Sequence, residues 1–76
     1  MIEANRELDA SGLNCPLPIL RAKKSMAELN SGEILKMVAT DPGSIKDIEA
    51  FCRQTGNELL QSSQENNLFT FFVKKA

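Results

Sequence analysis

Two prolines separated by a single residue, Pro16 and Pro18, constrain the fold of this chain more than any other feature. Proline has no backbone N–H and clashes with the preceding turn of a helix, so a helix tolerates it only near its first turn. Beyond the prolines, apolar residues recur at spacings of three and four, typical of one buried helix face: Ile19, Ala22, Met26 and Leu29. The prolines therefore predict a loop that changes here into an amphipathic helix running to about Leu29.

The sequence leaves two possible starts for this helix. With Cys15 as the N-cap, Pro16 and Pro18 are the first and third helical residues. A residue before proline avoids helical angles, however, so Leu17 can stay extended and the helix can start at Pro18. In both cases Cys15 lies at or just before the first turn, where backbone amides and the helix dipole stabilise a thiolate. The helix dipole contributes about 0.3–1 kcal/mol, which corresponds to less than one pKa unit. We therefore expect the Cys15 thiol to face outward and to be modestly activated. The backbone amides of Leu17 and Ile19 should be its nearest N–H groups.

Apolar runs predict four strands, at residues 6–10, 33–40, 58–63 and 68–74, the last two joined by a polar turn at 64–67. A second helix starts with Asp41 as N-cap and Pro42 behind it, or with Ser44 and Asp47 as a capping box, and ends at Gly56. Its expected buried stripe is Ile45, Ile48, Phe51 and Cys52. On the last strand Phe69, Phe71 and Val73 should face the core.

The order strand–helix–strand–helix–strand–strand predicts an α/β fold of the α+β two-layer kind. Right-handed crossovers place both helices on one face of a mixed four-stranded sheet. The other face is then open and carries the apolar side chains Ile34, Val38, Leu68 and Phe72. Seventy-six residues suffice for one small core, so we expect a single domain over residues 1–76.

Composition excludes several classes of function. A net charge of −1 argues against nucleic-acid binding, and the absence of histidine removes the usual general base and metal ligand. Two cysteines are too few for a structural zinc site. No apolar run is long enough to span a membrane, and the first residues lack a signal-peptide pattern. We therefore expect a cytoplasmic monomer without a metal, in which a standing Cys15–Cys52 disulfide is disfavoured.

The segment Cys15-Pro16-Leu17-Pro18 resembles the Cys-Pro-x-Pro motif of the TusA/SirA-like sulfur-carrier family, and the likeness extends through residues 8–13 and 39–48. The resemblance implies that Cys15 is the catalytic residue and carries sulfane sulfur as a persulfide, supported by Pro16 and Pro18. It implies a protein donor of the cysteine desulfurase or rhodanese type, a protein acceptor, and no cofactor besides the covalently held sulfur. It also implies a fold like the C-terminal domain of bacterial initiation factor three, with strand order 1-2-4-3. Whether such a sulfurtransferase-type carrier counts as an enzyme is left open.

The family supplies sulfur for tRNA thiolation, for the molybdenum cofactor or for sulfur oxidation. Asn14 stands where some members of the tRNA pathway have arginine, which weakens that assignment.

Other residues have two interpretations. Arg21, Lys23 and Lys24 are either a solvated helix face or a docking patch for an acidic partner. Cys52 continues an apolar stripe, which favours a core position over a second reactive thiol. The alternatives to a sulfur carrier are a thiol-redox module that uses Cys15 and Cys52, and a regulatory domain that binds through the open sheet face.

Overall fold

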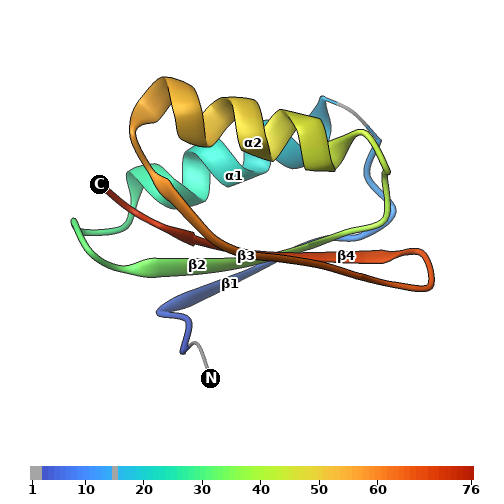
Figure 1. The fold of residues 1–76 in the computed structure, drawn as a ribbon, viewed down its shortest axis with the longest axis horizontal. Coiled ribbons are helices and arrows are strands. Elements are labelled where there is room, and N and C mark those ends of the chain that lie inside the picture. The colour runs from blue at the N-terminus through green and yellow to red at the C-terminus, as the bar shows by residue number, and fades with distance from the viewer. Residues whose placement is uncertain (1–2, 15) are drawn as a thin grey trace.

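The computed structural model describes residues 3–14 and 16–76, which form four strands and two helices (Figure 1). In chain order the elements are β1 (Arg6–Ala10), α1 (Leu17–Ala27), β2 (Ile34–Ala39), α2 (Ser44–Thr55), β3 (Glu58–Glu65) and β4 (Leu68–Lys74). Both helices cover the same face of the sheet, and the other face has no helix over it (Figure 1). The predicted order of elements and the two-layer architecture are confirmed.

The sheet has the order β1-β2-β4-β3, as the family resemblance implied. β1 pairs with β2 in parallel, whereas β4 pairs antiparallel with both β2 and β3. β2 and β4 are therefore the interior strands, which explains why both are rich in apolar residues. Because each helix connects parallel strands, α1 and α2 run in the same direction, and both begin at the sheet edge where β1 and β2 end.

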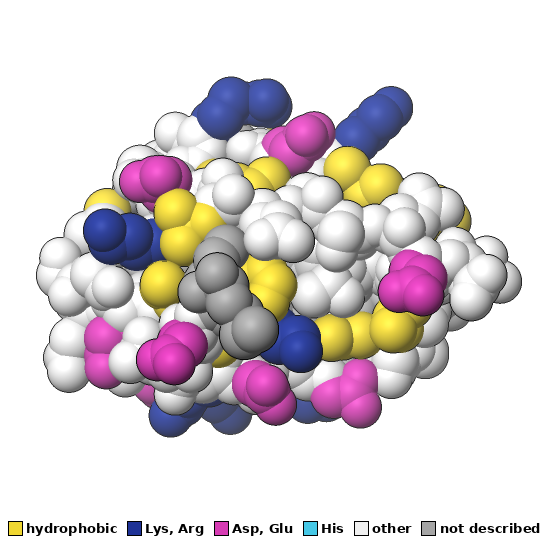
Figure 2. All heavy atoms as spheres, turned by 60° about the horizontal axis from the view of Figure 1, so that its bottom comes forward, with side chains coloured by type: hydrophobic (Ala, Val, Ile, Leu, Met, Phe, Trp, Pro, Cys, Tyr) yellow, Lys and Arg dark blue, Asp and Glu magenta, His cyan; other side chains and the backbone are white. Residues whose placement is uncertain are grey.

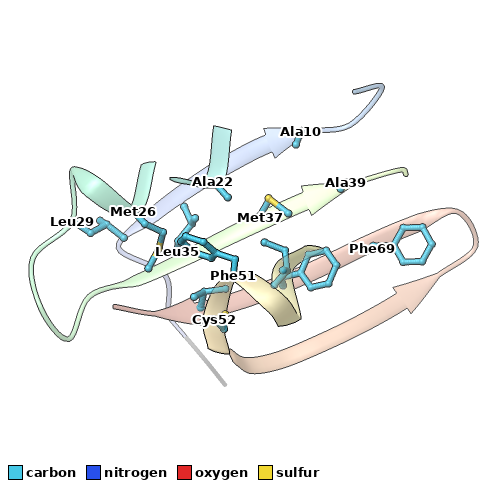
Figure 3. Packing of buried hydrophobic residues seen from close by; sticks show 13 residues of the cluster. Ala10, Ala22, Met26, Leu29, Leu35, Met37, Ala39, Phe51, Cys52 and Phe69 are labelled. Atoms are coloured by element: carbon cyan, nitrogen blue, oxygen red, sulfur yellow. The ribbon is translucent and has the colours of Figure 1, made fainter. Parts of the chain in front are cut away.

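The core lies between the sheet and the helices (Figure 3). Leu35, Met37 and Phe71 from the interior strands are fully buried and form its floor. Most residues of the two predicted helical stripes are also buried and face this floor from the helical layer: Ala22, Met26, Leu29, Ile48, Phe51 and Cys52. Ile19 and Ile45 are half-buried and pack against this core, so they lie at the margin of the predicted stripes. Pro18 and Ser44, each one residue earlier, are fully buried.

Three of the four helix ends differ from the prediction by one or two residues. α1 ends at Ala27, two residues before the predicted end, because the amides of Glu28 and Leu29 turn back to the carbonyls of Ser25 and Met26, three residues earlier. The N-cap of α2 is Gly43, so neither Asp41 nor Ser44 occupies that position. The predicted end of α2 at Gly56, which adopts a left-handed φ of 79°, is confirmed.

Asp41 precedes α2 and accepts hydrogen bonds from the residues at its start. Its carboxylate accepts a hydrogen bond from the Gly43 amide at 3.1 Å, and its carbonyl accepts one from the Ser44 hydroxyl at 2.7 Å. The Ser44 hydroxyl therefore donates towards the preceding turn, and Ser44 is the first helical residue, not the N-cap that the predicted capping box requires. The sequence signal for a helix start was correct, but Pro42 and Gly43 form a turn before the first helical residue.

The hairpin between β3 and β4 is tighter than predicted. β3 extends to Glu65, and only Asn66 and Asn67 remain as a two-residue turn in place of the predicted 64–67. Asn66 adopts a φ of 57°, a left-handed conformation that asparagine tolerates better than most residues.

Candidate functional site

The loop between β1 and α1 contains the predicted reactive residue. Cys15 itself lies outside the described residues, so its predicted exposure, its nearest amide donors and any pairing with Cys52 stay predictions. Its two neighbours in sequence, Asn14 and Pro16, are both exposed. The residues on either side of Cys15 define the geometry of the site.

A turn at the end of β1 redirects the chain from the sheet towards the helical layer. The Asp9 carboxylate accepts hydrogen bonds from the backbone amide and the hydroxyl of Ser11, at 3.0 and 2.5 Å. Gly12 follows with a φ of +79°, a conformation that costs residues with a Cβ about 1 kcal/mol or more. The Leu13 amide then donates to the carbonyl of Ala10 at 3.3 Å. These contacts fix the path of the loop before it reaches Cys15.

A hydrogen bond ties this loop to the neighbouring strand. The Gly12 amide donates to the hydroxyl oxygen of Thr40, the residue after β2, at 2.8 Å. Because β1 and β2 are parallel, their carboxyl ends meet at one edge of the sheet, and both helices begin there (Figure 1). The Asp41-Pro42 segment, which follows Thr40, therefore lies at the same edge as the loop.

The first turn of α1 corrects the predicted positions of the prolines in the helix. Pro16 is the N-cap, with φ −98° and ψ 14°, and Pro18 is the second helical residue, with a fully buried ring. The Leu17 amide donates to the carbonyl of Asn14 at 2.8 Å, so it is not one of the open donors expected beside the thiol. The first turn has neither an acidic residue nor a side-chain cap. A nearby anion would thus meet the positive end of the helix dipole without a competing carboxylate on that turn.

The outward face of α1 combines apolar and cationic side chains. Leu17 and Leu20 are 46% and 51% exposed, unusually high for leucine, and Arg21 and Lys24 follow on the same helical face. Lys23 is also exposed, but its position in the helix turns it away from this face. The sequence analysis missed the two leucines. Their exposure could have been predicted, because Leu17 and Leu20 fall outside the buried stripe of α1 and lie within two turns of Cys15.

Cys52 occupies the core, as its position in the apolar stripe predicted (Figure 3). It is a free thiol with 6% exposure, and burial raises its pKa because the low-dielectric surroundings disfavour the thiolate. It belongs to the last turns of α2. Since α1 and α2 run in the same direction, these turns lie at the end of the helical layer away from the start of α1. This placement argues against a redox module that pairs Cys15 with Cys52.

Two general features limit the chemistry of the site. Within residues 3–14 and 16–76, histidine, cysteine and acidic side chains nowhere gather in groups of three that could hold a metal ion. Neither described helix has the length and apolar character needed to cross a membrane. The described residues thus offer a positioned loop and a mixed apolar and basic helix face.

Titration of Asp9 tests the turn at the end of β1. The two hydrogen bonds from Ser11 lower the pKa of Asp9, because they stabilise its charged form. A carboxyl whose pKa is depressed on folding stabilises the fold above its unfolded value of about 3.9, and this stabilisation is lost as the pH falls through the folded value. We expect Ser11→Ala to raise the pKa of Asp9 towards its ordinary value in a carboxyl-carbon NMR titration. An Asp9 pKa that is unchanged in Ser11→Ala would contradict the turn described here.

The structure defines a small α+β domain in which a cysteine-containing loop leads from a parallel strand pair into a helix. Comparisons with known proteins place the chain within this class. The sequence profile of the family described as sulfurtransferase TusA matches residues 6–75. The chain therefore belongs to the TusA family.

Named relatives agree with this assignment. The sulfur carrier protein TusA of Allochromatium vinosum is 58% identical over the full length of both chains. A putative sulfur carrier protein of Neisseria meningitidis is 54% identical over 88% of this chain and 90% of its own. The crystal structure of a SirA-like protein from Desulfitobacterium hafniense superimposes with a TM-score of 0.81 over 91% of this chain and 95% of its own. At 24% identity, that structure supports the fold alone.

Proposed function

We propose that this protein accepts a sulfane sulfur on Cys15, holds it as a persulfide and passes it to an acceptor protein. The observation that carries the proposal is the loop itself: a cysteine directly before the start of α1, in a chain that belongs to the TusA family. A sulfur carrier needs a donor and an acceptor, and protein partners of both kinds are part of the proposal.

The transfer balances without an oxidant or reductant. The Cys15 thiolate attacks the outer sulfur of a donor persulfide, the sulfur–sulfur bond of the donor breaks, and the donor cysteine leaves as a thiolate. In the second step an acceptor thiolate attacks the outer sulfur on Cys15 and releases the Cys15 thiolate. The thiolate is the reactive form in both steps, which the start of α1 favours through its dipole and its lack of acidic residues.

The motif prolines support the site without taking part in bond making. The buried ring of Pro18 anchors the first turn of α1 in the core, and Pro16 caps that turn. Both residues restrict the backbone around Cys15, which lowers the entropy lost when the sulfur meets a partner.

The outward face of α1 is proposed as the docking surface for an acidic partner. Arg21 and Lys24 supply charge there, and Leu17 and Leu20 supply apolar area. Lys23 contributes charge from beside this face. Because this region adjoins Cys15 in sequence, a partner bound here would have its own cysteine close to the transfer loop.

The partners and setting follow the family resemblance. The donor is a cysteine desulfurase or a rhodanese-type protein, the acceptor is a protein, and the chain acts as a single cytoplasmic domain, a monomer, without binding nucleic acid directly. The experiment that tests the proposal is intact mass spectrometry after incubation with inorganic polysulfide. It should show the added mass of one sulfur atom, which a reductant removes; a protein that gains no sulfur would contradict the proposal.

Charge reversal on α1 tests the docking surface. We expect the double variant Arg21→Glu, Lys24→Glu to accept sulfur from a persulfidated donor enzyme at least about tenfold more slowly at low salt, because electrostatic attraction acts mainly on association. Lys23→Glu should have a smaller effect. Arg53→Glu is the control, because Arg53 is exposed in the last turn of α2, at the end of the helical layer away from the loop. The measurement is the rate of transfer followed by mass. Equal slowing by Arg53→Glu would show that the net charge of the protein, and not this face of α1, sets the rate.

A further inference from the structure

The open face of the sheet is hollowed at the edge that holds the transfer loop. Two hollows, of about 330 and 370 Å³, lie on either side of Leu68, whose side chain is 43% exposed. The first hollow is lined by residues of β1 and β2, among them Asp9 and Val38, and by Ser11. The second is lined by Thr40 and by the hairpin residues from Glu65 to Asn67. Leu68 thus contributes to the lining of both hollows, and the two hollows together are called the groove.

The groove borders the loop before Cys15. Ser11 lines it directly, and Thr40 both lines it and accepts the hydrogen bond from the Gly12 amide. The register explains this arrangement: Asp9 lies opposite Val38, and Phe69 lies opposite Ala39, so Leu68 comes next to Thr40. A molecule seated in the groove would therefore contact the same residues that position the loop.

The charges around the groove are mainly negative. Glu7 and Asp9 line it on the side of β1, and Glu65 lines it on the side of the hairpin. Lys36 also lines the groove, and its Nζ lies 4.0 Å from Oε1 of Glu7 and 6.0 Å from the ring centre of Phe72. Figure 2 shows hydrophobic side chains on this face between acidic side chains. The complementary ligand is a chain segment with apolar side chains flanked by lysine or arginine.

We infer that this groove is a second docking surface, which binds a basic and apolar segment of a partner protein. The outward face of α1 is basic, so the two surfaces beside the loop suit partners of opposite charge. A donor and an acceptor can then be distinguished by where they bind, although both must reach the same cysteine. The role of the groove as a partner surface rests on the proposed sulfur relay. The ability of the groove to bind a basic and apolar segment does not depend on that proposal.

A titration followed by amide NMR spectra tests the groove in the full-length protein. The probe is a short, capped peptide of lysine and leucine, and its matched control has glutamate in place of lysine. We expect saturable shift changes at Val38, Thr40 and Leu68 with the basic peptide only. The double variant Leu68→Ser, Glu65→Gln should bind it at least about tenfold more weakly, since the buried contact and a flanking charge are both lost. Leu20→Ser on α1 should bind it as the unchanged protein does.

Three outcomes would overturn the inference. They are no saturable shifts, shifts centred on α1, and equal binding by the double variant. Leu68 and Glu65 are both exposed, so the double variant should fold, and its amide spectrum verifies this before the titration. Polysulfide loading of the unchanged protein is measured in parallel. Normal loading without peptide binding would end this inference and leave the sulfur-carrier proposal standing.

Discussion

Replacing Cys15 with serine is expected to abolish sulfur loading, while Cys52→Ser loads one sulfur atom like the unchanged protein. A hydroxyl oxygen cannot form the persulfide, so the loss in Cys15→Ser should be complete. Cys52 is 6% exposed, and burial raises its pKa, so the reactive thiolate is disfavoured there. The measurement is intact mass after incubation with polysulfide, before and after a reductant. Cys52→Ala is a second control if the serine hydroxyl destabilises the core.

The same pair of variants separates the sulfur carrier from a thiol-redox module. A redox module would lose its activity in both variants, and the unchanged protein would lose two hydrogen atoms under a mild oxidant as the disulfide forms. Loading that persists in Cys15→Ser, or that disappears in Cys52→Ser, would contradict the proposed role of Cys15. If the protein were a regulatory domain without sulfur chemistry, neither the variants nor the unchanged protein would take up sulfur.

The sequence predicted the fold well because the order of elements and the apolar patterns are local signals. Alternation in β4 correctly placed Phe71 inside, and the prolines marked the start of α1 within one residue. The errors concern the ends of elements, where several local arrangements compete. Asp41 is a good N-cap residue, yet a Pro42-Gly43 turn intervenes, so the cap position passes to Gly43. The strand order came from the family resemblance, since nothing in the local pattern distinguishes it.

The site was predictable only in part, because its geometry depends on contacts between distant segments. The motif located the loop and named Cys15, and the helical spacing indicated that Arg21, Lys23 and Lys24 lie outside the buried stripe. The hydrogen bond from Gly12 to Thr40 joins residues 28 positions apart and requires the parallel register of β1 and β2. The groove at Leu68 likewise exists only because the hairpin turn is placed beside Thr40. No pattern within a single element could reveal either feature.

Replacing Phe71 with alanine should destabilise the protein more than any exposed substitution. Its side chain is fully buried at the centre of β4, opposite Met37 on β2 and Ser62 on β3. Phenylalanine-to-alanine changes in a core cost about 3–5 kcal/mol, since the removed ring leaves a cavity that the surroundings fill only partly. A domain of 76 residues has a free energy of unfolding of about 4–11 kcal/mol, so the variant should lose about a quarter or more of its stability. Urea denaturation followed by circular dichroism measures the change.

Phe72→Ala is the matched control, because it removes the same ring one residue further along the same strand. Phe72 points to the open face and is only half-buried, so its loss should cost about 1 kcal/mol, from partial burial and the contact with Lys36. A cost for Phe72→Ala equal to that for Phe71→Ala would mean that both faces of β4 are covered in solution. That result would contradict the monomer with an open sheet face, and a molecular mass measured by light scattering would show whether a second copy provides the cover.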